Sequence, residues 1–138
     1  MNAEELKERT KQFALSVMHL VDALPKSIKG RTIANQVIRS GTSVAANYRA
    51  ACRSRSRPEF IAKIGTVEVE ADETALWLEP IIADKILPNK KVFPLLAEAN
   101  ELVAFMAAPF NTARSKVSAP RDPSQKSAIR NRQSEINS

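Results

Sequence analysis

The sequence is poor in the residues on which several classes of site depend. Its 138 residues include one cysteine and one histidine, too few for an internal disulfide, a structural zinc site or a histidine cluster around a catalytic metal. Three glycines are too few for a glycine-rich phosphate loop and argue against a many-turned β-sandwich. We therefore expect no catalytic residues, no cofactor and no metal site.

Long apolar runs are also missing. No segment approaches the ~18 apolar residues of a membrane span, so we expect no membrane partner. Met1 is followed by Glu4, Glu5 and Glu8 rather than by the basic and then apolar stretch of a secretion signal. These features predict a cytoplasmic protein.

The net charge of +6 is unevenly distributed along the chain. Residues 1–24 carry a net −1, 25–63 a net +8, 64–113 a net −5 and 114–138 a net +4. The protein is therefore strongly polarised rather than uniformly basic, and its basic and acidic segments are consecutive. Much of the positive charge has acidic neighbours available within the fold.

Apolar residues recur at three-, four- and seven-residue steps in four segments, the pattern of amphipathic helices. The first segment stops at Pro25, and the second starts near Arg31 or Thr32, after a connection over residues 26–31. Ser56 or Arg57 precedes the third, which has Pro58 in its first turn. The fourth follows a connection over residues 84–91, and Pro94 is expected near its first turn.

Within the second and third segments, three residues carry specific expectations. Gly41 lowers helix propensity, so a close approach by another helix is the expected reason for it. Cys52 continues an apolar stripe and is expected to be buried. Pro80 should bend or shorten the end of its helix.

Four amphipathic helices with short links predict an all-α fold, an antiparallel up-down-up-down four-helix bundle over residues 1–114. From residue 115 the composition changes to serine, proline, basic and amide residues with few apolar ones. Such a segment cannot bury enough surface to offset its ordering entropy. Residues 115–138 are therefore predicted to be a disordered basic tail.

The second and third helical segments resemble a bacterial family known as four-helix-bundle or 23S rRNA intervening-sequence proteins. The resemblance rests on QVIRSGTSVAAN at 36–47, YRAACRSRS at 48–56, EFIAKIG at 59–65, VEVEADE at 67–73 and LWLE at 76–79. It implies a bundle that assembles into a ring-like homopentamer. One member of the family is an accessory protein of diversity-generating retroelements, where a positive surface engages nucleic acid and a reverse transcriptase.

A basic set at the end of the second segment is the strongest candidate for contact with nucleic acid. Arginine forks pair with phosphates, and several such contacts give non-specific, salt-sensitive binding. The set consists of Arg49, Arg53, Arg55, Arg57 and Lys63. The competing interpretation is that these cations pair with acidic residues or are simply solvated.

The acidic residues of the third segment offer partners for such pairing. Arg39 is expected to be the cation most committed to them. The predicted ion-pair network comprises Arg39, Glu68, Glu70, Asp72 and Glu73. The Glu-x-x-His pattern of bundle metal sites is missing, so a solvated or salt-bridged face is the better interpretation.

Three other side chains are candidates for a catalytic role or for a subunit interface. His19 and Cys52 are the only pair that could start a nucleophilic dyad, and no accompanying oxyanion site is recognisable. Trp77 lies off the main apolar seam, which makes it a candidate for a subunit interface; the alternative is a partly exposed residue covering the end of the bundle.

Together these features predict a non-enzymatic, self-assembling scaffold. Its expected partners are further copies of itself, RNA or DNA, and a nucleic-acid-processing protein. The alternative is a purely structural homo-oligomer whose Arg and Glu sets pair between subunits. An enzyme would require a cavity in which His19 or Cys52 meets the carboxylates.

Overall fold

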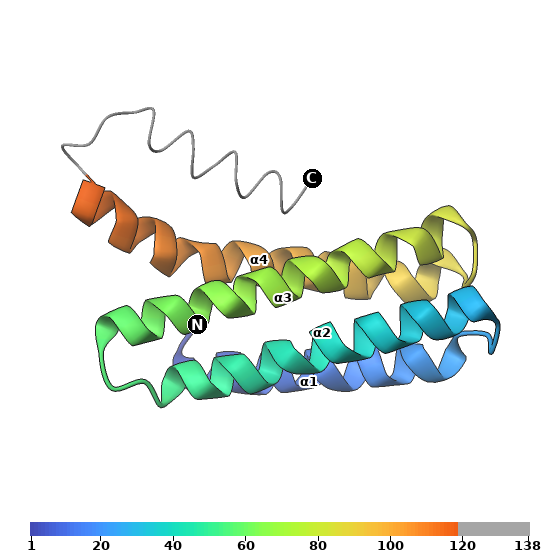
Figure 1. Cartoon of the computed structure of the whole chain (residues 1–138), viewed down its shortest axis with the longest axis horizontal. Coiled ribbons are helices and arrows are strands. Elements are labelled where there is room, and N and C mark those ends of the chain that lie inside the picture. The colour runs from blue at the N-terminus through green and yellow to red at the C-terminus, as the bar shows by residue number, and fades with distance from the viewer. Residues whose placement is uncertain (119–138) are drawn as a thin grey trace.

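The protein consists of four helices that follow one another with short connections (Figure 1). The computed structural model describes the backbone of residues 1–118 and the side chains of residues 1–108. The helices are α1 (Ala3–Ala23), α2 (Ile28–Cys52), α3 (Arg57–Ala83) and α4 (Asn89–Ser118). No strand occurs over the described backbone, and the all-α prediction is confirmed. Residues 115–118, predicted to belong to the disordered tail, are part of α4, and the rest of the predicted tail, from 119 onward, lies outside the described residues.

Each helix runs antiparallel to the next, which confirms the up-down-up-down bundle (Figure 1). α2 packs on α1, α3 on α2 and α4 on α3, whereas α4 returns to α1 with only a light contact. The 27 residues of α3 span ~40 Å at 1.5 Å per residue, which makes the molecule elongated. None of the four helices, over the described residues, is long and apolar enough to cross a membrane.

Side-chain caps set the starts of the first three helices. The Asn2 side chain accepts a hydrogen bond from the Glu5 amide at 2.8 Å, and Ser56 accepts one from the Glu59 amide at 3.2 Å. Pro58 lies in the first turn of α3, where a missing N–H costs no hydrogen bond. Ser56, one of the two residues predicted to precede this helix, is therefore its N-cap, and the helix begins at Arg57.

The start predicted for α2 near residue 31 is wrong. Ser27 is the cap, because its hydroxyl accepts a hydrogen bond from the Gly30 amide at 3.1 Å, and the helix begins at Ile28. Gly30, predicted to lie in the connection, is in the first turn of the helix and packs closely against the connection that precedes it. A Cβ atom there would lie 2.0 Å from the Pro25 carbonyl oxygen.

Gly41 lies where α2 crosses α1. A Cβ atom at this position would lie 2.7 Å from a methyl carbon of Val17, closer than van der Waals contact allows. Both residues are buried. The prediction that a neighbouring helix approaches closely at Gly41 is confirmed.

The connection from α3 to α4 is shorter than predicted, because α4 already begins at Asn89. α3 continues three residues beyond Pro80, to Ala83, so this proline does not end the helix. After Asp84, the amide of Lys85 donates to the Ile82 carbonyl at 3.1 Å and that of Ile86 to the Ile81 carbonyl at 2.9 Å. These two bonds form a Schellman motif, with Lys85 in the left-handed region at φ 54°.

Pro94 does not lie in the first turn of α4, where it was predicted. The early start of α4 at Asn89 puts Pro94 beyond the first turn, where a proline removes a backbone hydrogen bond from the helix. The helix nevertheless continues through Pro94.

The core runs the length of the bundle, and the seam predicted for α3 is confirmed from Ile64 to Ile81. Among its buried residues, Thr74 donates a hydrogen bond to the Ser40 hydroxyl at 2.8 Å and so fixes the register of α3 against α2. Cys52 is exposed, so its predicted burial is wrong. Ala51 occupies the buried position at the end of α2 instead.

Candidate nucleic-acid interface

The predicted basic set lies where α2 ends and α3 begins, at the end of the bundle opposite the α3–α4 connection (Figure 1). Arg49 is in the last turn of α2, Arg53 is its C-cap, and Arg55 lies in the connection. Arg57 opens α3. These four arginines are exposed, and Lys63, one and a half turns further along α3, is half-buried.

None of these five cations forms an ion pair with another side chain of residues 1–108. Other cations of the bundle are engaged: Arg9 pairs with Glu98, and Lys29 pairs with Asp84 at 2.5 Å. Glu4, near the same end of the molecule as the basic set, is paired with Lys7 at 2.9 Å. Among the side chains of residues 1–108, no carboxylate pairs with the guanidinium groups of the basic set, so they are available to an external anion.

The backbone beneath the basic set is well held although its four arginine side chains are exposed. The Arg53 amide donates to the carbonyls of Ala50 and Ala51, which closes α2. The Arg55 amide donates to the Glu59 carboxylate at 3.2 Å, which ties the connection to the start of α3. The set is therefore presented on a fixed turn.

Arg39 has a different environment from the basic set. Its guanidinium forms ion pairs with Glu70, at 3.3 Å, and with Glu73 on the neighbouring α3. About half of the Arg39 side chain is exposed, so solvent screens these pairs and each is worth ~1 kcal/mol or less. Arg39, Glu70 and Glu73 are therefore the members of the predicted ion-pair network that the structure brings together.

Glu68 and Asp72 lie on another face of α3, with Glu79 about two turns beyond Asp72. The positions 68, 72 and 79 fall within about 40° of one another on a helical wheel at 100° per residue. Glu68 is 8% exposed and Asp72 is half-buried. Burial, and then the negative charge of Glu79, raise the pKa of Asp72. These carboxylates therefore form an acidic stripe separate from the Arg39 pairs.

Trp77 is partly buried against the core. The apolar side chains that α3 leaves exposed are instead Val69, at 47%, and Leu76, at 54%. The preference of tryptophan for interfaces favours Trp77 as a contact residue, whereas the neighbouring Leu76 presents more of its surface to solvent.

The two side chains considered for a nucleophilic dyad lie far apart. Burial, and then the contact with Cys52, raise the pKa of the Tyr48 phenol to about 12. Glu4 acts electrostatically on the same phenol, which places this pair beside the start of α1. His19 lies 15 residues further along α1, or ~22 Å. Among the described side chains, no group of three or more histidine, cysteine or carboxylate residues could hold a metal ion.

Comparisons with known proteins agree with the resemblance found in the sequence. A solved structure with TM-score 0.70 and 29% identity covers 75% of this chain and 96% of its own; it is a protein of unknown function from the S23 ribosomal protein family of Bacteroides thetaiotaomicron. No curated protein matches the sequence. The family model for the 23S rRNA-intervening sequence protein matches residues 4–108. The chain therefore belongs to the 23S rRNA-intervening sequence protein family.

Proposed function

We propose that this protein is a non-enzymatic, self-assembling helical scaffold that holds RNA or DNA through the basic set at the α2–α3 turn. The observation that carries the proposal is that Arg49, Arg53, Arg55 and Arg57 are exposed and unpaired among the described side chains. Glu70 and Glu73 of α3 pair with Arg39. Glu59 lies at the turn itself, where its carboxylate accepts the Arg55 amide and forms no ion pair with a guanidinium group of the basic set. These carboxylates therefore leave the basic set free for phosphates.

Contact between arginine and phosphates is electrostatic and does not depend on the base sequence of the nucleic acid. Each neutralised phosphate releases condensed counterions, so binding weakens steeply as salt rises. Aromatic side chains for stacking bases are missing from the basic set, and Tyr48, the nearest along α2, is buried. We therefore expect the protein to bind single strands without sequence preference.

Self-assembly is supported by the apolar surface that α3 and α4 leave uncovered. Val69 and Leu76 on α3 and Phe93 on α4 are 47%, 54% and 49% exposed. α3 carries apolar residues on its outer side as well as its core side, and such a helix is normally covered on both. We propose a homo-oligomer, with the pentameric ring implied by the family resemblance as the expected form.

A ring would repeat the basic set once in every subunit. Weak phosphate contacts in several subunits would then act together on one strand and raise its affinity by avidity. The same surface could hold a nucleic-acid-processing protein alongside its substrate. The proposed setting is the cytoplasm.

The second candidate is a purely structural homo-oligomer in which the basic set pairs with carboxylates of a neighbouring subunit. The observation that favours it is the acidic stripe, because Asp72 is half-buried and Glu79 is exposed beside the uncovered Leu76. In that arrangement the arginines would be needed for assembly and would not be available to nucleic acid.

One pair of variants separates the two candidates. In the first, Arg53→Gln, Arg55→Gln and Arg57→Gln remove three positive charges from the α2–α3 turn. The control carries Lys26→Gln, Lys85→Gln and Lys90→Gln, which remove the same charge from exposed positions at the other end of the bundle. Binding to a fluorescent single-stranded RNA is measured by anisotropy, and the oligomer mass by light scattering.

We expect the arginine variant to keep its oligomer mass and to lose about tenfold or more in RNA affinity, because each lost phosphate contact weakens binding. The lysine control should stay much closer to the unmodified protein. If the arginine variant instead changes its mass while the unmodified protein binds no RNA, the structural oligomer is the correct function. Equal losses in both variants would mean that the α2–α3 turn has no special role.

A further inference from the structure

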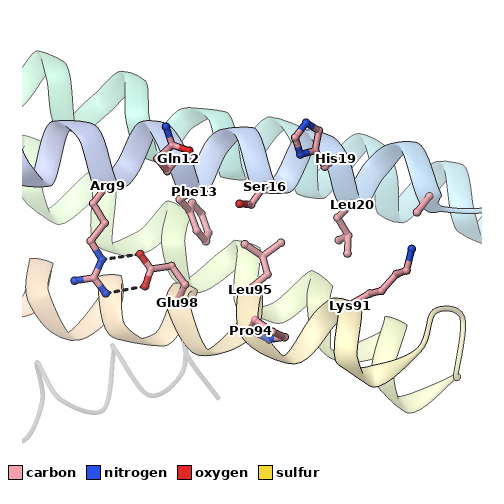
Figure 2. Close-up of a pocket in the computed structure, with 11 residues that line it drawn as sticks. Arg9, Gln12, Phe13, Ser16, His19, Leu20, Lys91, Pro94, Leu95 and Glu98 are labelled. Atoms are coloured by element: carbon pink, nitrogen blue, oxygen red, sulfur yellow. Dashed lines mark hydrogen bonds and ion pairs between the residues drawn. The ribbon is translucent and has the colours of Figure 1, made fainter.

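A groove runs along the seam between α1 and α4, the pair of helices with the lightest contact in the bundle (Figure 2). Its volume is about 540 Å³, within the usual range of small-molecule sites. Ser16 and Ala23 on α1 and Pro94 on α4 are among its walls. Because these side chains are short, they leave the space between the two helices unfilled.

The floor of the groove is apolar. Phe13, Leu20 and Leu95 line it and are 2%, 6% and 7% exposed. Phe13 and Leu20 come from α1 and Leu95 from α4, and the three belong to the main core. An apolar body lying in the groove would therefore rest on core side chains and remove more of their surface from water.

One end of the groove is closed by a complete ion pair. The Arg9 guanidinium donates to the Glu98 carboxylate at 2.6 and 2.7 Å and to Glu101 at 3.1 Å (Figure 2). The charges at this end are thus already matched. An anionic ligand would gain little from Arg9 unless it displaced Glu98.

The other end of the groove carries an unmatched positive charge. Lys91 extends from α4 toward α1 (Figure 2) and has no ion-pair partner among the side chains of residues 1–108. Ser16 and His19 on α1 line the same groove and can donate or accept hydrogen bonds. This end therefore favours a negatively charged head group.

We propose that the α1–α4 groove binds a small amphipathic carboxylate, of the class of medium-chain fatty acids. The carboxylate pairs with Lys91, and the hydrocarbon chain lies over Leu20 and Leu95 toward Phe13. The stretch of α1 from residue 13 to residue 23 gives the groove a length of ~15 Å, which suits an extended chain of this class. A cationic amphiphile would be repelled by Lys91, and a neutral one would form no ion pair with it.

This site is independent of the proposed nucleic-acid surface, because Lys91 lies near the α3–α4 connection and the basic set lies at the opposite end of the bundle. Its occupancy is measured by calorimetry on the full chain, using decanoate below its micelle concentration. Decanol supplies the same hydrocarbon body without the charge, and acetate supplies the carboxylate without the body. We expect decanoate to bind and both decanol and acetate to bind at least about tenfold more weakly.

Two variants test the placement of the ligand. Lys91→Gln should weaken decanoate binding about tenfold or more, whereas Lys90→Gln, at the neighbouring exposed position outside the groove, should not. Ser16→Leu should fill the groove and abolish binding; Ser16 is exposed, so this variant is expected to fold. Circular dichroism and urea unfolding confirm that each variant is intact.

Three results would overturn the proposal. The first is equal affinity for decanoate and decanol, which would show that the charge is not recognised. The second is equal behaviour of Lys91→Gln and Lys90→Gln. The third is a change of oligomer mass on adding decanoate, together with a loss of decanoate binding in the assembled form. That result would show that a second copy of the chain occupies the groove.

Discussion

Arg9 and Glu98, 89 residues apart, form a bidentate ion pair that joins the first helix to the last. The guanidinium also lies 5.2 Å from the centre of the Phe105 ring, a cation–π distance. The Glu98 side chain is the main cause that raises the pKa of Arg9 further above its already high ordinary value. An arginine is charged at all physiological pH values even at its ordinary pKa, so the pair contributes to stability throughout that range. It compensates for the light packing between α1 and α4.

Arg9→Gln should destabilise the protein by about 1–3 kcal/mol, because the Glu98 carboxylate, 26% exposed, loses two charge-assisted hydrogen bonds. Urea unfolding gives the free energy. Lys11→Gln, which removes an exposed pair with Glu8, is the control and should cost ~0.5 kcal/mol or less. In a double-mutant cycle with Glu98→Gln, strictly additive effects would show that the pair is not coupled.

Gly41→Ala should destabilise the bundle by about 1–3 kcal/mol, because the added methyl group overlaps Val17. Gly65→Ala is the matched control on α3, where a Cβ atom meets nothing within 4 Å. That variant should be more stable by about 1 kcal/mol through helix propensity alone. Thermal and urea unfolding of both variants measure the difference. Gly41→Ala as stable as Gly65→Ala would mean that α1 and α2 do not approach closely at this position.

Asp72 should make stability depend on pH. Its pKa is raised in the folded protein by burial and by Glu79, so the folded state binds this proton more tightly than the unfolded state does. Stability from this group is therefore present below the ordinary aspartate pKa of about 4 and is lost as pH rises through the raised value. Asp72→Asn should stabilise the protein at pH 7 and have no such effect near pH 3. Glu79→Gln should bring the Asp72 titration, followed by carbon-13 NMR, back toward its ordinary value.

Lys85→Gly should stabilise the protein by about 1 kcal/mol. Lys85 holds a positive φ in the Schellman motif after α3, a conformation that costs a residue with a Cβ atom roughly 1–2 kcal/mol and glycine almost nothing. Lys90→Gly, within the helical part of α4, is the control and should destabilise instead. Urea midpoints of the two variants measure the contrast. A loss of stability in Lys85→Gly would show that this turn does not adopt the left-handed conformation.

The helical periodicity of the sequence was sufficient to predict the number of helices, their order and most of the core. The start of α2 was missed because Gly30 reads as a loop residue, whereas it is required by contact with the Pro25 carbonyl. Cys52 was misplaced because the apolar stripe of α2 shifts to Ala51 in its last turn. Both errors concern helix ends, where tertiary contacts decide which residue is covered.

The candidate sites differ in how far they could be predicted. The pairing of Arg39 with α3 follows from antiparallel neighbours of opposite charge, and the exposure of Arg53, Arg55 and Arg57 follows from their place at the connection between two helices. The α1–α4 groove has no signal in the sequence, because it depends on how closely the first and last helices meet. Short side chains such as Ser16 and Ala23 acquire their role only when they face Lys91 and Pro94 across that seam.

The most direct test of the proposed function is the salt dependence of binding to single-stranded RNA. The logarithm of the association constant should fall linearly with the logarithm of salt concentration, with a slope of about −0.7 for each phosphate contacted. In the variant with Arg53→Gln, Arg55→Gln and Arg57→Gln, the slope should become shallower by about 2 for each bound subunit. A slope near zero in the unmodified protein, or an unchanged slope in the variant, would contradict the assignment of the α2–α3 turn as a nucleic-acid surface.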